Sequence, residues 1–264
     1  MTDSDGNEEA SRTDEKAPVG PYVIKGMPVG VSHFSISMDE NGNVTADLRL
    51  NVGLDVTHHW LGIAIQHVET CNGAKGIVDR AWRNGDANAF ALLEQEFTDA
   101  MQAVAAAAFA LDAFYACVKE HAPVPDEVRE AWRKNRTSRA AQLAEAFRLA
   151  FRMDEMSFRI IRDRIGQIFK CRDIAVHPPG TLSEPVLHPR MNVAIEQRFV
   201  IFSTENAQNS AASALSIVAQ LIRIPKPDNA ALGEYCRVAR ERIDPILVEW
   251  EATHGALFER ASDQ

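Results

Sequence analysis

The most informative hydrophobic pattern in this chain lies between Phe158 and Gly180. Positions on the apolar stripe there recur four, three, four and three residues apart, which places them on one face of a helix. The stripe consists of Ile161, Ile165, Ile168, Arg172 and Ala175. An arginine on a buried stripe is costly unless a partner satisfies its charge. The pattern therefore predicts a helix with a paired arginine near its end.

The residues after this stripe predict where the helix stops. Pro178 disfavours helical geometry at the preceding residue, so His177 is expected at the helix C-terminus. The partial negative charge at that end would favour a protonated imidazole. Asp173 lies between Arg172 and His177 in the sequence. Two interpretations stay open: a structural helix end with a capping histidine and an arginine that reaches solvent, or a site where both side chains act on a phosphate.

The longest apolar pattern predicts a central helix over residues 86–121. It is apolar nearly all round, so it is expected in the middle of its domain. Gln102 and Asp112 interrupt the apolar run, which favours a buried helix over a membrane span. Asp112 either edges the seam or is a buried partner for an arginine. The seam consists of Phe97, Met101, Val104, Ala108, Leu111, Tyr115 and Val118.

Near the amino terminus the period changes to two, which predicts strands. Residues 31–38 and 44–52 alternate between apolar and polar, and the Asn41-Gly42 pair between them favours a hairpin turn. A two-stranded hairpin is marginally stable alone, so it should pack on another element or gain a strand. Residues 192–203 are a candidate third strand, although a helix there is an alternative.

The remaining segments predict further helices and their boundaries. Residues 55–72 have a helical pattern that Gly73 and Gly76 interrupt, and one helix is expected from an Asp126 cap to Arg152. Asp154 or Ser157 should cap the helix that carries Arg172, and a stiff, proline-rich loop covers 178–190. Residues 205–224 form another helix, and two more are expected near the C-terminus, beginning at Leu232 and at Asp244-Pro245.

These patterns divide the chain into five parts. They are an acidic, disordered tail (1–20), the hairpin (21–54), an accessory helix (55–84), a helical domain (85–224) and C-terminal helices (225–264).

Charge is distributed unevenly along the sequence. The net charge of −9 argues against a generally basic nucleic-acid binder. Residues 129–172, however, hold twelve bases against five acids. Such an excess is a solvated helix face or a groove that binds phosphate, and it leads directly into the Arg172 segment.

The sequence contains no pattern typical of a metal site, an exported protein or a membrane protein. Four cysteines occur without a C-x-x-C pair and are expected to be reduced and mostly buried. His58, His59 and His67 lie close together, but no carboxylate pair completes a ligand set. We therefore expect no metal, no signal peptide, no membrane association and a cytoplasmic location.

The motif and the helix order resemble the HEPN superfamily of all-helical domains. That family carries an arginine, a polar residue and a histidine at the end of a late helix, here Arg172-Asp173-Ile174-Ala175-Val176-His177. The alanine- and aromatic-rich segment Ala110–Val118 is similar to the family's packing helix, and residues 205–224 would be its closing helix. The resemblance implies a mainly α fold, a HEPN-like helical bundle with a small N-terminal β-hairpin and extra C-terminal helices.

The resemblance also implies an activity. Family members with an intact motif are often metal-independent endoribonucleases without a cofactor, and they act as homodimers in which two motifs meet in one cleft. His177 would transfer protons to or from RNA, since its ordinary pKa is about 6.5. Arg172 would bind the phosphate, and Asp173 would orient either residue. Only RNA has the attacking 2′-hydroxyl, so DNA should not be cleaved.

Two alternatives remain beside a free ribonuclease. The first is a noncatalytic module for dimerisation or for binding nucleotides or proteins, in which Arg172 is structural and pairs with Asp112 or Glu96. The second is a toxin- or defence-like ribonuclease that an inhibitory partner protein keeps silent. The solvent accessibility of the Arg172 and His177 side chains distinguishes an enzyme from a noncatalytic module, because catalysis requires both side chains to face one cleft that is open to solvent.

Overall fold

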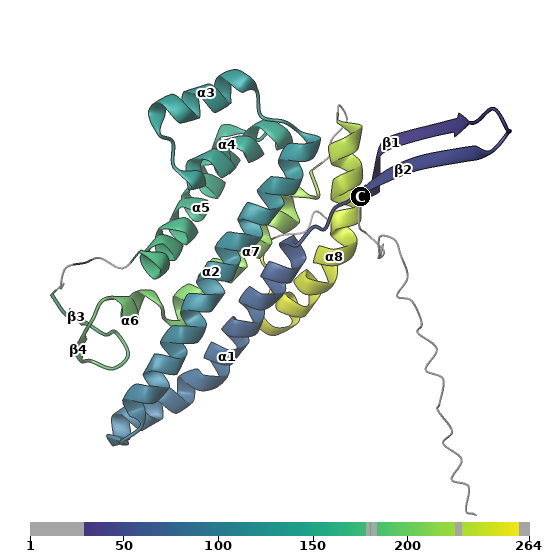
Figure 1. Cartoon of the computed structure of the whole chain (residues 1–264). Helices are drawn as coiled ribbons and strands as arrows, with labels where there is room; N and C mark the ends of the chain where they lie inside the picture. The colour runs from purple at the N-terminus through teal and green to yellow at the C-terminus, as the bar shows by residue number, and fades with distance from the viewer. Residues whose placement is uncertain (1–28, 178–179, 181–183, 225–228, 259–264) are drawn as a thin grey trace, which may run out of the picture. The chain divides into compact units, whose positions relative to one another are not determined.

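The computed structural model describes residues 29–177, 180, 184–224 and 229–258 (Figure 1). Within them the chain is mainly helical with a small N-terminal hairpin, which confirms the predicted fold class. The acidic tail expected over 1–20 lies outside the described residues. The elements are β1 (Val29–Met38), β2 (Val44–Val52), α1 (Thr57–Asn84), α2 (Ala89–His121), α3 (Asp126–Asn135), α4 (Arg139–Phe151), α5 (Glu155–Val176), β3 (Val186–Leu187), β4 (Ala194–Ile195), α6 (Arg198–Ile201), α7 (Thr204–Leu221) and α8 (Ala230–His254).

The chain divides into two compact units, one ending at Leu54 and the other beginning at Asp55. The first contains the predicted hairpin, in which β1 and β2 pair antiparallel. Its turn is closed by the Asp39 carboxylate, which accepts hydrogen bonds from the backbone N–H groups of Asn41 (2.9 Å) and Asn43 (2.8 Å). Gly42 adopts a positive φ of 82°, the conformation that explains a glycine at this position.

Helix α2 is the centre of the second unit, as its apolar pattern predicts. It packs along α1 and also contacts α4, α5, α7 and α8 (Figure 1). Ala103, Ala107 and Ala110 are fully buried, because their small side chains let neighbouring helices approach closely. By length and hydropathy alone α2 could cross a membrane, but more than half of its most apolar window is buried inside this unit.

Helix α1 is longer than the sequence indicates. The interruption expected at Gly73 and Gly76 is wrong, because the helix continues from Thr57 to Asn84. A glycine within a helix costs only about 1 kcal/mol relative to alanine. Burial of apolar residues on both sides of the two glycines, including Val68 and Val78, outweighs that cost.

The single helix expected over 126–152 is wrong, because α3 and α4 are separate. Arg136 adopts the left-handed conformation (φ 50°) and ends α3. Ser138 then caps α4, its hydroxyl accepting a hydrogen bond from the backbone N–H of Ala141 (3.3 Å). Asp126 is the first helical residue of α3, and the cap position belongs to Pro125.

The third strand considered for 192–203 does not join the hairpin. Only Ala194–Ile195 is extended, and it pairs with Val186–Leu187 of the segment that follows α5. The chain then turns into the short helix α6. Residues 178–179 and 181–183 of the proline-rich loop lie outside the described residues.

The two C-terminal helices expected near Pro245 are one helix in the structure. Helix α8 runs from Ala230 to His254 with Pro245 inside it. A proline in a helix removes one backbone hydrogen bond. Ile243, Leu247 and Trp250 are buried on either side of it, and their packing holds the helix together across this position.

Candidate functional site

Helix α5 presents the Arg172 motif as its pattern predicts. Asp154 caps the helix, with its carboxylate accepting a hydrogen bond from the backbone N–H of Ser157 (2.9 Å). The helix ends at Val176, where the backbone N–H of His177 donates to the carbonyl of Asp173 (2.8 Å). The predicted end of the helix before Pro178 is therefore confirmed.

Arg172 continues the buried stripe of α5 but is held by polar and aromatic partners. Its side chain is 20% exposed, and its Nε and Nη2 atoms donate to Asp173 Oδ1 at 2.9 and 2.6 Å. The guanidinium carbon lies 4.6 Å from the centre of the Phe169 ring, within range of a cation–π interaction. Asp173 thus fixes the direction in which the guanidinium points.

Asp112 approaches the same arginine from α2. One of its carboxylate oxygens accepts a hydrogen bond from Arg139 Nε (2.7 Å), and the other lies 4.0 Å from Arg172 Nη1. Arg139 is also held 4.4 Å above the ring of Tyr115. Asp112 is therefore half-buried at the edge of the seam and is shared by two arginines.

The motif residues line one pocket that is open to solvent. Its volume is about 460 Å³, and its walls include Arg139, Lys170, Arg172, Asp173 and His177. His177 is exposed. Among the described residues, neither its imidazole nor the ammonium group of Lys170 has a hydrogen-bond or ion-pair partner. The pocket therefore combines three permanent cations with one accessible imidazole, and we call it the motif pocket.

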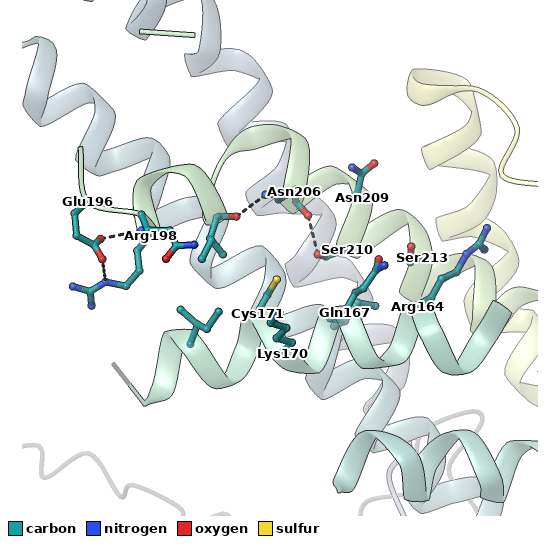
Figure 2. Close-up of a pocket in the computed structure, with 14 residues that line it drawn as sticks. Arg164, Gln167, Lys170, Cys171, Glu196, Arg198, Asn206, Asn209, Ser210 and Ser213 are labelled. Atoms are coloured by element: carbon teal, nitrogen blue, oxygen red, sulfur yellow. Dashed lines mark hydrogen bonds and ion pairs between the residues drawn. The ribbon is translucent and has the colours of Figure 1, made fainter. Parts of the chain in front are cut away.

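A second hollow lies on the other side of α5, between this helix, α6 and α7 (Figure 2). Its volume is about 620 Å³, and it shares Lys170 and Ile174 with the motif pocket. Amide and hydroxyl side chains dominate its polar lining, together with Arg164 and Arg198. Glu196 holds Arg198 (3.0 Å), whereas Arg164 has no carboxylate partner in the described part of the chain. The amide and hydroxyl residues are Gln167, Gln197, Asn206, Asn209, Ser210 and Ser213.

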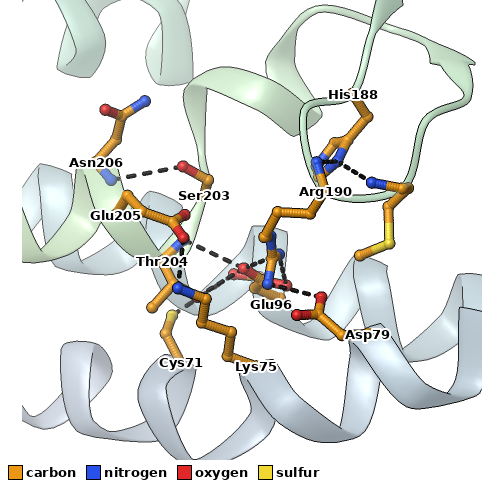
Figure 3. A network of polar contacts seen from close by, with 11 residues as sticks. Cys71, Lys75, Asp79, Glu96, His188, Arg190, Ser203, Thr204, Glu205 and Asn206 are labelled. Carbon is orange, nitrogen blue, oxygen red and sulfur yellow. Dashed lines mark hydrogen bonds and ion pairs between the residues drawn. The ribbon is translucent and has the colours of Figure 1, made fainter.

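Glu96, considered above as a partner of Arg172, pairs with another arginine. Its carboxylate is 1% exposed and accepts hydrogen bonds from Arg190 Nη2 (2.6 Å) and the Thr204 hydroxyl (2.6 Å), as Figure 3 shows. Arg190 also binds Asp79 of α1 (3.0 Å). This buried network ties the segment after α5 to α1, α2 and the start of α7, so it supports the position of the chain beyond the motif.

His188 lies next to this network and is 1% exposed. Its Nδ1 atom accepts hydrogen bonds from the backbone N–H groups of Arg190 and Met191, both at 3.3 Å. In this arrangement Nδ1 carries no proton, so the imidazole is neutral. Burial, and then the charge of Arg190, lowers the pKa of His188. The carboxylates of Glu96, Glu205 and Asp79 act in the opposite direction but are outweighed.

This arrangement predicts a pH dependence of stability. A histidine whose pKa is lowered by folding contributes stability above its unfolded pKa of about 6.5, and that contribution is lost as the pH falls. In His188→Asn the side-chain oxygen can accept the same two N–H groups without titrating. Urea unfolding from about pH 8 to about pH 5 should therefore show a weaker pH dependence in the variant. Identical slopes in the two proteins would contradict this role of His188.

The other candidate ligand residues are engaged elsewhere. The rings of His58 and His59 lie 4.0 Å apart, and His67 Nδ1 lies 3.0 Å from Asp99 Oδ1. No three His, Cys, Asp or Glu side chains come together as metal ligands within the described ranges. All four cysteines are free thiols, and burial raises the pKa of Cys171 in the hollow of Figure 2. That thiol is therefore a poor nucleophile.

Sequence reasoning identified the motif but missed much of its surroundings. In the sequence, Arg139 and Lys170 are part of the basic excess of residues 129–172, and no pattern distinguishes them within it. Arg190 and His188 lie in a proline-rich loop that had no assigned role. Glu96 and Asp112, two acids within the apolar helix α2, are the signals in the sequence for arginine partners on that helix.

No family model matches this sequence, and no curated protein or solved structure shows significant similarity to it. The function must therefore be inferred from the geometry around α5 and from the residues Arg172 to His177.

Proposed function

We propose that this chain is a metal-independent endoribonuclease of HEPN type. The observation that carries the proposal is that Arg172, Asp173 and His177 line one solvent-open pocket together with Arg139 and Lys170. A structural helix end requires neither an accessible imidazole nor a neighbouring lysine that, among the described residues, has no carboxylate partner. Both suit the cleavage of a phosphodiester, in which the imidazole transfers protons and the cations stabilise the charge that develops on the phosphate.

The proposed reaction uses a nucleophile from the RNA itself. The 2′-oxygen attacks the adjacent phosphorus, the O2′–P bond forms and the P–O5′ bond breaks. The products are a 2′,3′-cyclic phosphate and a 5′-hydroxyl end. His177 takes the proton from the 2′-hydroxyl or gives one to the leaving 5′-oxygen. In a homodimer whose two motif pockets meet, two copies of His177 could divide these tasks.

The cations of the motif pocket suit the charge that develops on the phosphate. Arg172 has two of its nitrogens occupied by Asp173, whereas Nη1 is 4.0 Å from Asp112, beyond hydrogen-bond length, and remains able to donate to a phosphate oxygen. Lys170 lines both the motif pocket and the second hollow, which lies between α5, α6 and α7. A single strand could therefore cross α5 here, with its phosphates on Lys170 and Arg164 and with amide groups available to its bases.

A noncatalytic binding module is the second candidate, and Arg172 itself favours it. This side chain is four-fifths buried, stacks on Phe169 and is bound by the neighbouring Asp173. Those contacts would also be present in an arginine that only stabilises the helix end. Thermal melting of Arg172→Ala separates the two roles. If Arg172 is structural, its loss should lower the melting temperature well beyond the change that His177→Ala causes.

The test uses the purified chain of 264 residues with end-labelled RNA and with DNA of the same sequence, all in EDTA. We expect RNA to be cut and DNA to remain intact, because DNA lacks the 2′-hydroxyl. Cleavage of the DNA as well as the RNA would contradict the proposed chemistry. Binding of RNA without cleavage would favour the noncatalytic module. If the chain does cleave RNA, an inhibitory partner can be sought by adding candidate proteins and measuring the loss of cleavage.

A further inference from the structure

The N-terminal hairpin has one face that is apolar along its whole length. A bulge at Ser32, where the register shifts between Val31 and His33, moves the alternation by one residue in β1. Without this bulge, the apolar residues before and after it would point to opposite faces. The resulting face is formed by five cross-strand pairs: Val29–Val52, Val31–Leu50, Phe34–Leu48, Ile36–Ala46 and Met38–Val44.

The described residues of the hairpin's own unit do not cover this apolar face. Eight of its side chains expose between 37% and 71% of their surface. An aromatic side chain covers about 150–250 Å², and the seven aliphatic side chains here are smaller, so the exposed parts of the eight add up to a continuous patch of several hundred Å². The largest apolar patch on a typical monomer is about 300–600 Å². The eight residues are Val29, Val31, Phe34, Ile36, Met38, Val44, Leu48 and Leu50.

We infer that the occupant of this face is the same face of a second copy of this chain. A standard, stable protein interface buries about 800 Å² from each partner, and a continuous apolar face of several hundred Å² is suited to form its centre. The face contains no charged residue, so two identical copies can stack about a two-fold axis without opposing like charges. Two hairpins packed in this way form a four-stranded sandwich, which supplies the packing that an isolated hairpin lacks.

The charges on the rest of the hairpin disfavour a lipid surface as the occupant. Residues 29–52 contain Asp39, Glu40 and Asp47 against Arg49, a net charge of −2 from one base and three acids. The polar face contains no lysine, and Asp47 lies between His33 (3.6 Å) and Arg49 (3.9 Å). Segments that lie on membranes are typically rich in Lys and Arg on their polar face.

Sedimentation of the chain of 264 residues tests the interface. Wild type should sediment with twice the 29.2 kDa mass of one chain. Phe34→Asp combined with Leu48→Asp, a directly opposed pair on the apolar face, should reduce the mass to one chain. The matched control is Ser37→Asp with Thr45→Asp, an opposed pair on the polar face, and it should leave the mass unchanged. Equal helical circular dichroism would show that all three proteins are folded.

A cross-linking measurement separates this interface from any dimer contact elsewhere in the chain. Ala46→Cys places a thiol on the apolar face, and Thr45→Cys places one on the opposite face. Copper–phenanthroline oxidation should link two chains in the Ala46→Cys protein and not in the Thr45→Cys protein or in wild type. A wild-type mass of one chain would overturn the inference. The inference would also be overturned if the variant with Phe34→Asp and Leu48→Asp kept the wild-type mass and the Ala46→Cys protein formed no cross-linked dimer. Binding to phosphatidylcholine–phosphatidylserine vesicles that depends on the apolar face would overturn it as well. None of these outcomes depends on ribonuclease activity.

Discussion

Replacing His177 with alanine is expected to lower the rate of RNA cleavage by about 10²–10⁴-fold, the usual contribution of a positioned acid or base. The substitution should leave stability nearly unchanged, because His177 is exposed and its only hydrogen bond to α5 comes from its backbone. Initial rates on end-labelled RNA in EDTA measure the first effect, and thermal melting measures the second.

His59 provides the matched control for this experiment. It is an exposed histidine on α1 and does not line the motif pocket. His59→Ala should therefore cleave RNA at the wild-type rate. If the two alanine variants retain equal activity, His177 takes no part in proton transfer, and the cleavage arises from another site or from a contaminating nuclease.

Replacing Glu96 with alanine is expected to lower the free energy of unfolding by about 3–5 kcal/mol, the usual cost of removing one partner from a buried ion pair. The variant would leave Arg190 half-paired, with only Asp79 remaining, and would remove the acceptor of the Thr204 hydroxyl. It would also remove a carboxylate from the N-terminus of α7, where a negative charge is favourable. Urea unfolding followed by circular dichroism measures the loss.

Two further variants show whether the loss comes from the pair. Glu130→Ala removes an exposed acid that pairs with Arg133 at 3.9 Å, and it should cost at most about 1 kcal/mol. Glu96→Leu combined with Arg190→Met removes both charges and should be more stable than Glu96→Ala, because the charge that then loses its partner is that of Asp79, whose side chain is 31% exposed. A loss of under 1 kcal/mol for Glu96→Ala would contradict the role assigned to this network.

Several parts of the fold could be predicted because the signals for them are local. The Asn41-Gly42 turn and the period of two define the hairpin, and the four-and-three spacing defines α2 and α5. The end of α5 at Val176 follows from Pro178, which restricts the residue before it. These features depend on residues that are near one another in the sequence.

The predictions that failed are those in which packing overrides a local signal. Gly73 and Pro245 disfavour helix by a few kcal/mol at most, and burial of the apolar residues around them outweighs that cost. The break between α3 and α4 depends on a left-handed arginine and a serine cap, and helical periodicity does not show either of them. The pairing of residues 194–195 with 186–187 depends on contacts that the sequence pattern does not encode.

The candidate site was partly predictable for the same reason. Arg172, Asp173 and His177 lie within six residues on one helix, so their neighbourhood follows from helical geometry. Arg139 comes from α4 and Asp112 from α2, and only the tertiary structure brings Arg139 into the motif pocket and Asp112 beside both arginines. Glu96 and Arg190 are 94 residues apart in the sequence, and a local sequence pattern does not predict a pair at that separation.

The central claim is that the RNA's own 2′-hydroxyl attacks the phosphate beside the Arg172 motif. The most direct test uses a short RNA with one 2′-deoxynucleotide at the cleaved position and identifies the product ends by mass spectrometry. We expect the all-RNA substrate to yield 2′,3′-cyclic phosphate and 5′-hydroxyl ends in EDTA, and the single deoxy substitution to block cleavage there. Cleavage at the deoxy position, or products with 5′-phosphate ends, would contradict the proposed function.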